Sequence, residues 1–227
     1  MTNETTVPTS RPHTLEGWVK LLDAVRLPVP QASHDRVCKA IADSRSSMRD
    51  IAELMQDSPA LALSVIREAN QHTHGSMTET AENLEVALNR LGLKRTEQLL
   101  AHLPARPESE IPIALRQLQL ISQHATQQAN GLFGSRLARL WQDIHWGSLL
   151  FQPPLWPLAL TYPQLLDEWE LRVIRRGQSA HKVEKELFGV RLLVLCQALV
   201  DLWRLPIWVQ QGYRLLLNEQ RLLVQVL

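Results

Sequence analysis

Two scarcities, of cysteine and of net charge, exclude several classes of protein before any motif is considered. The 227 residues include only two cysteines, Cys38 and Cys196, too few for a disulfide framework. We expect two reduced thiols in apolar helical surroundings. Lys and Arg total 24 against 23 Asp and Glu, a net charge of +1. This balance gives no field that would attract nucleic acid or an anionic membrane, so neither is expected as a partner.

Long apolar runs are also missing. The most apolar stretch, residues 147–161, contains three prolines, and proline interrupts the hydrogen bonds of a helix. The next candidate, residues 187–203, is broken by Arg191 and Asp201, so no segment is expected to span a membrane. Residues 1–13 are polar and lack the apolar core of a secretory signal. We therefore expect a cytoplasmic protein that begins with a disordered leader.

The motifs that bind phosphate or activate a nucleophile are absent as well. The chain has no G-x-x-x-x-G-K-S/T loop, no G-x-G-x-x-G turn and no G-x-S-x-G elbow. The tightest histidine pair, His72 and His74, has no acidic neighbour, and we interpret it as part of a surface loop. The His34–Asp35 doublet follows Ser33, and we interpret Asp35 as a first-turn carboxylate that stabilises a helix dipole.

Apolar residues recur with a helical period. The segments Met48–Met55 and Leu84–Leu91 each place apolar side chains at positions i, i+3, i+4 and i+7, which is one face of a helix. Ser47 with Asp50 predicts a capping box, and Ser58 before Pro59 predicts a helix start. The sequence therefore predicts an all-α fold.

A proline-containing break at residues 103–112 suggests two lobes. We predict one domain over residues 14–217, with lobes at about 14–104 and 111–217 and a C-terminal tail at 218–227. The predicted elements of the second lobe are a long helical region at about 113–150 interrupted near Gly131 and Gly134, helices at about 164–176, 179–188 and 191–203, and a last helix after Pro206.

Tryptophan is concentrated in the second lobe, where its large area suits a core or an interface. Trp156 lies within a proline-rich segment, and we expect it to be exposed and to mark an interaction surface. His145 lies between Trp141 and Trp146, and we predict a buried, hydrogen-bonded histidine rather than a metal ligand.

Several segments in a fixed order resemble a known family. They are Leu27–Pro30 (LPVP), Ile51–Met55 (IAELM), Asp57–Leu61 (DSPAL), Arg67–Asn70 (REAN), Leu84–Gly92 (LEVALNRLG), Val183–Gly189 (VEKELFG) and Leu202–Pro206 (LWRLP). Together they resemble the HDOD family, bacterial regulatory domains related to the HD metal-dependent phosphohydrolases. The resemblance spans about Leu15 to Leu217. It implies a multi-helix fold, with an N-terminal helical lobe followed by a degenerate HD-like helical lobe.

The chain departs from the catalytic relatives where the resemblance implies metal ligands. The His-Asp doublet position reads Phe151–Gln152, the position after Gly189 reads Val190–Arg191, and the position after the Leu-Pro helix reads Leu216–Leu217. Phenylalanine offers no lone pair, neutral glutamine is a poor bridging ligand, and arginine repels a cation. Only His124 falls on a ligand position, so no metal or other cofactor is expected.

The resemblance implies a non-catalytic signal-transduction module that acts in trans through protein contacts. A partner would dock on the groove of the lost site or on a surface around Trp156 and Arg191. Two alternatives remain open at this point. One is a divergent metal-dependent phosphohydrolase that uses His124, and the other is a sensor that binds a nucleotide without cleaving it, through basic residues such as Arg191.

Overall fold

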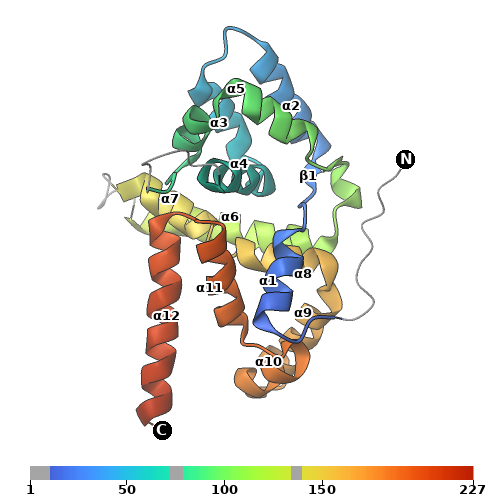
Figure 1. Cartoon of the computed structure of the whole chain (residues 1–227), viewed down its shortest axis with the longest axis vertical. Helices are drawn as coiled ribbons and strands as arrows, with labels where there is room; N and C mark the ends of the chain where they lie inside the picture. Colours follow the sequence, from blue (N-terminus) through green and yellow to red (C-terminus); the bar gives the residue numbers. More distant parts are fainter. Residues whose placement is uncertain (1–10, 72–78, 134–139, 227) are drawn as a thin grey trace.

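A computed structural model describes residues 11–71, 79–133 and 140–226, and its elements are helical apart from one very short strand pair (Figure 1). The α-helices are α1 (Leu15–Asp23), α2 (Gln31–Ala42), α3 (Met48–Gln56), α4 (Pro59–Gln71), α5 (Leu84–Ala101), α6 (Ile113–Phe133), α7 (Trp141–Leu149), α8 (Trp156–Thr161), α9 (Pro163–Trp169), α10 (Ala180–Phe188), α11 (Leu192–Leu202) and α12 (Ile207–Val226). Short turns are η1 (Glu108–Glu110), η3 (Pro153–Leu155) and the π-helical η4 (Glu170–Arg175). The predicted all-α class is confirmed.

The strand pair links the two ends of the first lobe. β1 (Val29–Pro30) runs parallel to β2 (Ala105–Arg106), with Val29 opposite Ala105. Each strand has only two residues, so the pair fastens two loops without forming a sheet layer.

Local signals set several helix starts as predicted. Ser47 Oγ accepts the Asp50 amide at 3.2 Å, and the Asp50 carboxylate accepts the Ser47 amide at 2.8 Å, which is the predicted capping box. α4 begins at Pro59. α2 differs, because it begins at Gln31 and Asp35 therefore lies beyond its first turn. There the Asp35 carboxylate accepts a hydrogen bond from the side-chain amide of Gln31 at 2.8 Å.

Glycine is required where a loop passes close to the end of α10. Gly189 has φ of +73°, and a Cβ at this position would lie 2.2 Å from the carbonyl oxygen of His13. Residues 11–13, the end of the predicted disordered leader, therefore lie against the second lobe. Residues 1–10 are outside the described part of the chain, and for them the leader stays a prediction.

α1 packs on the second lobe rather than on its sequence neighbours. Figure 1 shows it beside α8 and α11. Trp18 is fully buried there. Its indole N–H donates to the Phe188 carbonyl at 2.8 Å, and its ring meets Tyr162 edge-on at 5.4 Å between centroids. The N-terminal helix thus forms part of the core of the C-terminal half.

A buried arginine joins the two lobes. Arg67 on α4 pairs with the Asp23 carboxylate at the end of α1 at 2.8 Å, and its guanidinium lies 4.1 Å from the ring centroid of Trp203. The Trp203 indole N–H donates to the same Asp23 carboxylate at 2.8 Å. Burial lowers the pKa of Arg67 to about 10, although Asp23 acts in the opposite direction. α4, α1 and α11 therefore meet where the positive charge of Arg67 is balanced by Asp23.

Asn70, one turn along α4, makes a second connection. Its side-chain amide donates to the Arg204 carbonyl at 2.7 Å and accepts the Ala81 amide at 2.7 Å. Arg204, at the corner between α11 and α12, has φ of +50° and donates back to the Asn70 carbonyl at 3.2 Å. The Arg67–Asn70 segment therefore fixes that corner against the first lobe.

Several boundaries in the second lobe differ from expectation. α12 extends across the predicted boundary at residue 218 as far as Val226. The predicted helix at 164–176 consists of α9 followed by the π-helical η4. None of the described helices combines the length and apolarity needed to cross a bilayer.

We predict that Asp23→Ala will lower the free energy of unfolding by about 2–3 kcal/mol, because the Arg67 guanidinium would remain buried without its carboxylate. Urea denaturation of the purified variant measures this loss. Asp201→Ala is a matched control, since Asp201 pairs with Arg214 on the surface and such pairs contribute little. Equal losses in the two variants would contradict the assigned role of Asp23.

Candidate functional site

Phe151, at the first position of the expected His-Asp doublet, is held by aromatic packing. It follows the end of α7, and its ring stacks on Tyr213 of α12 with 4.5 Å between centroids and 13° between planes. The Tyr213 hydroxyl donates to the Phe151 carbonyl at 2.6 Å. A Cβ on Gly212 would lie 3.0 Å from the Phe151 ring, so α12 lies closely against this side chain.

Gln152, at the second doublet position, faces a hydroxyl of α6. Its side-chain oxygen lies 3.3 Å from Ser122 Oγ. Ser122 and Thr126 form the buried face of α6 at this level. Neither group carries a charge, so this contact offers no carboxylate to a cation.

His124 does not join this cluster. It is exposed on α6, two residues beyond Ser122 and therefore about 200° around the helix axis. The one histidine that the family resemblance placed at a ligand position thus faces away from Gln152.

Arg191 is half-buried at the N-cap position of α11. The carboxylate near it belongs to Glu184, a buried residue that the sequence reasoning did not single out. Glu184 accepts the Leu192 amide at 3.2 Å and the Trp169 indole N–H at 3.3 Å. Glu184 therefore caps the start of α11. The only signal for this role in the sequence is that Glu184 lies eight residues before Leu192, the first residue of α11.

The expectation that Trp156 is exposed is wrong. Trp156 is fully buried because η3 turns the proline-rich segment inward and α8 packs against α6 and α1. It cannot form an interaction surface. The exposed tryptophans of the described residues are Trp141 and Trp208, with 47% and 48% of their surface accessible.

These residues do not fit a divalent metal. In the described ranges no three His, Cys, Asp or Glu side chains are placed to hold an ion together. The expected ligand positions instead provide a phenyl ring, a neutral amide and a guanidinium, none of which suits a hard cation. His72 and His74 lie outside the described residues.

His145 behaves as a structural histidine. Its Nδ1 lies 3.2 Å from the Asn130 side-chain nitrogen, and its ring contacts Trp141 and Trp146 at 6.1 and 5.0 Å between centroids. Because the Asn130 side-chain nitrogen can only donate, the ring nitrogen accepts this hydrogen bond, and burial lowers the pKa of His145. The predicted hydrogen bond is present, although the ring is half-buried.

Both cysteines are free thiols, and burial raises the pKa of each. The pKa of Cys196 rises to about 12, and that of the neighbouring Tyr213 is raised as well, mainly by burial. Cys38 is half-buried with its sulfur 3.8 Å from His34 Nδ1, a pair that the four-residue spacing could have revealed. Its pKa is raised too, by burial and then by Asp35. Raised values keep these groups protonated, which opposes nucleophilic chemistry.

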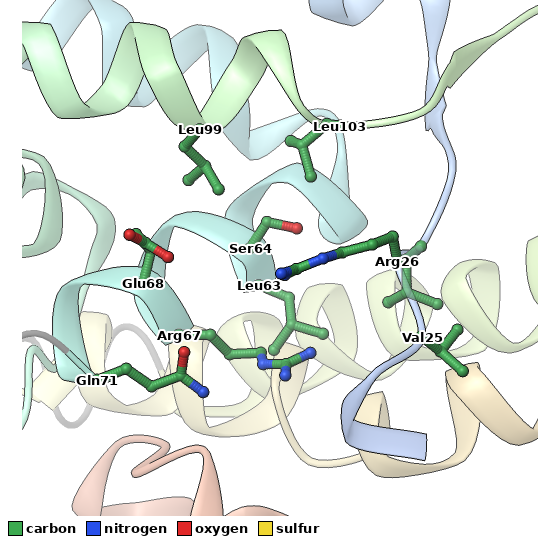
Figure 2. Close-up of a pocket in the computed structure, with 10 residues that line it drawn as sticks. Val25, Arg26, Leu63, Ser64, Arg67, Glu68, Gln71, Leu99 and Leu103 are labelled. Carbon is green, nitrogen blue, oxygen red and sulfur yellow. The ribbon is translucent and has the colours of Figure 1, made fainter. Parts of the chain in front are cut away.

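A separate polar cavity lies in the first lobe (Figure 2). It is formed by the segment after α1, by one side of α4 and by the end of α5. The side chains of Arg26, Ser64, Arg67 and Glu68 line it, together with leucines. Ser64 Oγ donates to the Ala60 carbonyl at 2.8 Å, and the other polar lining groups are the guanidinium groups of Arg26 and Arg67, the Glu68 carboxylate and the Gln71 amide.

Comparisons with known proteins agree with this architecture. The family model described as the HDOD domain matches residues 27–214. A virulence factor from Campylobacter jejuni subsp. jejuni is similar in structure at 13% identity, covering 88% of this chain and 71% of its own, with a TM-score of 0.64. The MmoQ response regulator from Methylococcus capsulatus str. Bath is similar at 20% identity, covering 85% and 78%, with a TM-score of 0.59. Among curated proteins there was no significant match.

We predict that the buried thiol of Cys196 makes the protein sensitive to alkali. A folded-state pKa near 12 against an ordinary value of 9.0 means that unfolding releases a proton above about pH 9, so stability falls as the pH rises. Between about pH 9 and pH 11 the free energy of unfolding should fall more steeply in the wild type than in Cys196→Ala, by up to about 1.4 kcal/mol per pH unit.

Urea denaturation at a series of pH values measures both slopes. Cys38→Ala is the control, because Cys38 is only half-buried and its removal should change the slope less. If Cys196→Ala keeps the wild-type slope, the thiol does not hold its proton in the folded state as described.

Proposed function

The chain belongs to the HDOD family, whose match covers residues 27–214, and from this premise we propose that it is a regulatory module of bacterial signal transduction that acts by binding another protein without catalysis. The observation that carries the proposal is the packing at the doublet position. Phe151 stacks on Tyr213, and Gln152 faces Ser122. A metal-binding pair is replaced there by core contacts.

The surface beside this position supports protein binding. On α12, Trp208 and Leu215 lie seven residues apart on one face, and Leu216 adjoins them. They expose 48%, 63% and 38% of their surface. Exposed apolar side chains that gather on one helix are typical of interaction sites. We call Trp208, Leu215 and Leu216 the α12 surface, and it takes the place of the docking surface expected at Trp156.

The packing of α12 on its neighbours explains why the α12 surface is exposed. Val209 and Tyr213 are buried, and they pack the helix on α11 and α7. Trp208 and Leu215 lie at least about 100° around the helix axis from both of these residues, so they are held outward on a fixed helix, which keeps the entropy cost of binding low. Leu216 follows Val209 by seven residues and lies at the edge of the buried side. The name of one fold relative, a response regulator, favours a signalling role in the cytoplasm.

We predict that the protein purified without chelators will contain well below one manganese, iron, zinc or nickel ion per chain, because Phe151, Gln152 and Arg191 provide no ligands. Elemental mass spectrometry measures the metal content, and a model phosphodiester assay with added Mn²⁺ measures hydrolysis. His124→Ala should leave both unchanged. Metal near one ion per chain that disappears in His124→Ala would establish the phosphohydrolase alternative instead.

We predict that Leu215→Glu will abolish capture of the partner protein, since a charge on the α12 surface would have to be desolvated on binding. In-cell crosslinking followed by mass spectrometry of the bound proteins measures this. Ile174→Glu is the matched control, because Ile174 is equally exposed on η4, with 65% of its surface accessible against 63% for Leu215. A partner retained by Leu215→Glu and lost from Ile174→Glu would move the binding site to η4.

A further inference from the structure

The cavity in the first lobe has an arginine on each side. Figure 2 shows Arg26, from the segment after α1, and Arg67, from α4, extending into the same space from opposite directions. Arg67 is the more buried of the two, with 11% of its side chain accessible. Guanidinium groups carry a fixed charge and a planar set of donors that match phosphate and carboxylate oxygens.

Arg67 keeps hydrogen-bond donors for a ligand. Both of its hydrogen bonds within the described residues use Nη2, which reaches the Asp23 carboxylate at 2.8 Å and the Asp23 carbonyl at 3.3 Å. Trp203 covers one face of the guanidinium at 4.1 Å. The N–H groups of Nε and Nη1 make no hydrogen bond within the described residues, and Arg67 is one of the residues that line the cavity.

Arg26 contributes a second positive charge on the other side of the cavity. It is exposed at the cavity mouth and makes no ion pair with the part of the chain that the structure describes. The charge of Arg26 lowers the pKa of Arg67, which reflects the repulsion between the two guanidinium groups. An anion between them would relieve that repulsion.

We propose that this cavity binds an oxyanion group, phosphate or carboxylate, between the guanidinium groups of Arg26 and Arg67. The cavity volume of about 20 Å³ is the space of one or two water-sized groups. It therefore accepts the charged head of a ligand and leaves the remainder outside. The observations behind this proposal do not include the α12 surface or the doublet position.

Glu68 is the one acidic residue that lines the cavity, and it sets the expected affinity. Its carboxylate lies 3.5 Å from the Arg95 guanidinium, so part of its charge is balanced outside the cavity. The negative charges of Glu68 and of Asp23, which pairs with Arg67 at 2.8 Å, both oppose an incoming anion, which predicts weak binding, with a Kd of roughly millimolar order. Removal of the Glu68 charge should tighten binding.

Isothermal titration calorimetry with inorganic phosphate and, separately, with acetate tests the proposal at constant ionic strength. We expect a saturable heat from the wild type, about tenfold weaker binding by Arg26→Gln, because one charge-assisted contact is lost, and tighter binding by Glu68→Gln. Arg175→Gln is the matched control, since it removes the same charge from an exposed pair with Glu170. It should bind like the wild type.

The two titrations also identify the chemistry. Preferential binding of phosphate assigns a phosphorylated ligand, and preferential binding of acetate assigns a carboxylate. The absence of saturable heat with either anion up to about 20 mM, or equal affinities for the wild type and a folded Arg26→Gln, would overturn the proposal. Thermal denaturation of each variant confirms that it is folded before it is titrated.

Discussion

The arrangement of the two lobes depends on the contact of Arg67 with Asp23 and Trp203. A guanidinium with 11% of its side chain exposed is costly to bury unless an opposite charge and hydrogen-bond acceptors accompany it. The charge and both acceptors come from Asp23 at the end of α1, and Trp203 after α11 covers one face of the guanidinium and donates to Asp23. The face of α4 that carries Arg67 can therefore be buried only when α1 and α11 are both in place. This explains why α1 packs with the second half of the chain.

Neutral side chains fill the core at Phe151 and Gln152, where the family resemblance leads to the expectation of a metal-binding doublet. A buried site that lacks some of its ligands would leave charges and lone pairs without partners. Phe151 avoids this by presenting an apolar ring to Tyr213, and Gln152 does so by presenting a neutral amide to Ser122. Glu184, which is buried in this lobe, caps α11 through the Leu192 amide and also accepts the Trp169 indole N–H. Phe151, Gln152 and Glu184 therefore each have a structural partner within the described residues.

The features that the sequence predicted correctly are those with local causes. The capping box of Ser47 and the start of α4 at Pro59 involve neighbouring residues, so periodicity and cap chemistry were sufficient. The prediction that Trp156 is exposed was wrong because a proline-rich segment indicates a turn but not the direction in which its side chains point. The pairing of Arg67 with Asp23 spans 44 residues, and no local pattern encodes such a contact. The family resemblance marked the Arg67–Asn70 segment but could not state its physical role.

The same segment links the cavity to the corner that carries α12. Arg67 lines the cavity and contacts Trp203, while Asn70 holds Arg204 through hydrogen bonds in both directions. α12 begins three residues after Arg204. A ligand that binds only when Arg67 is in its paired position necessarily stabilises that position by linkage. The binding free energy of the ligand then adds to that of the contacts that fix the start of α12. Occupancy of the cavity and the orientation of the α12 surface therefore depend on the same segment, Arg67–Asn70.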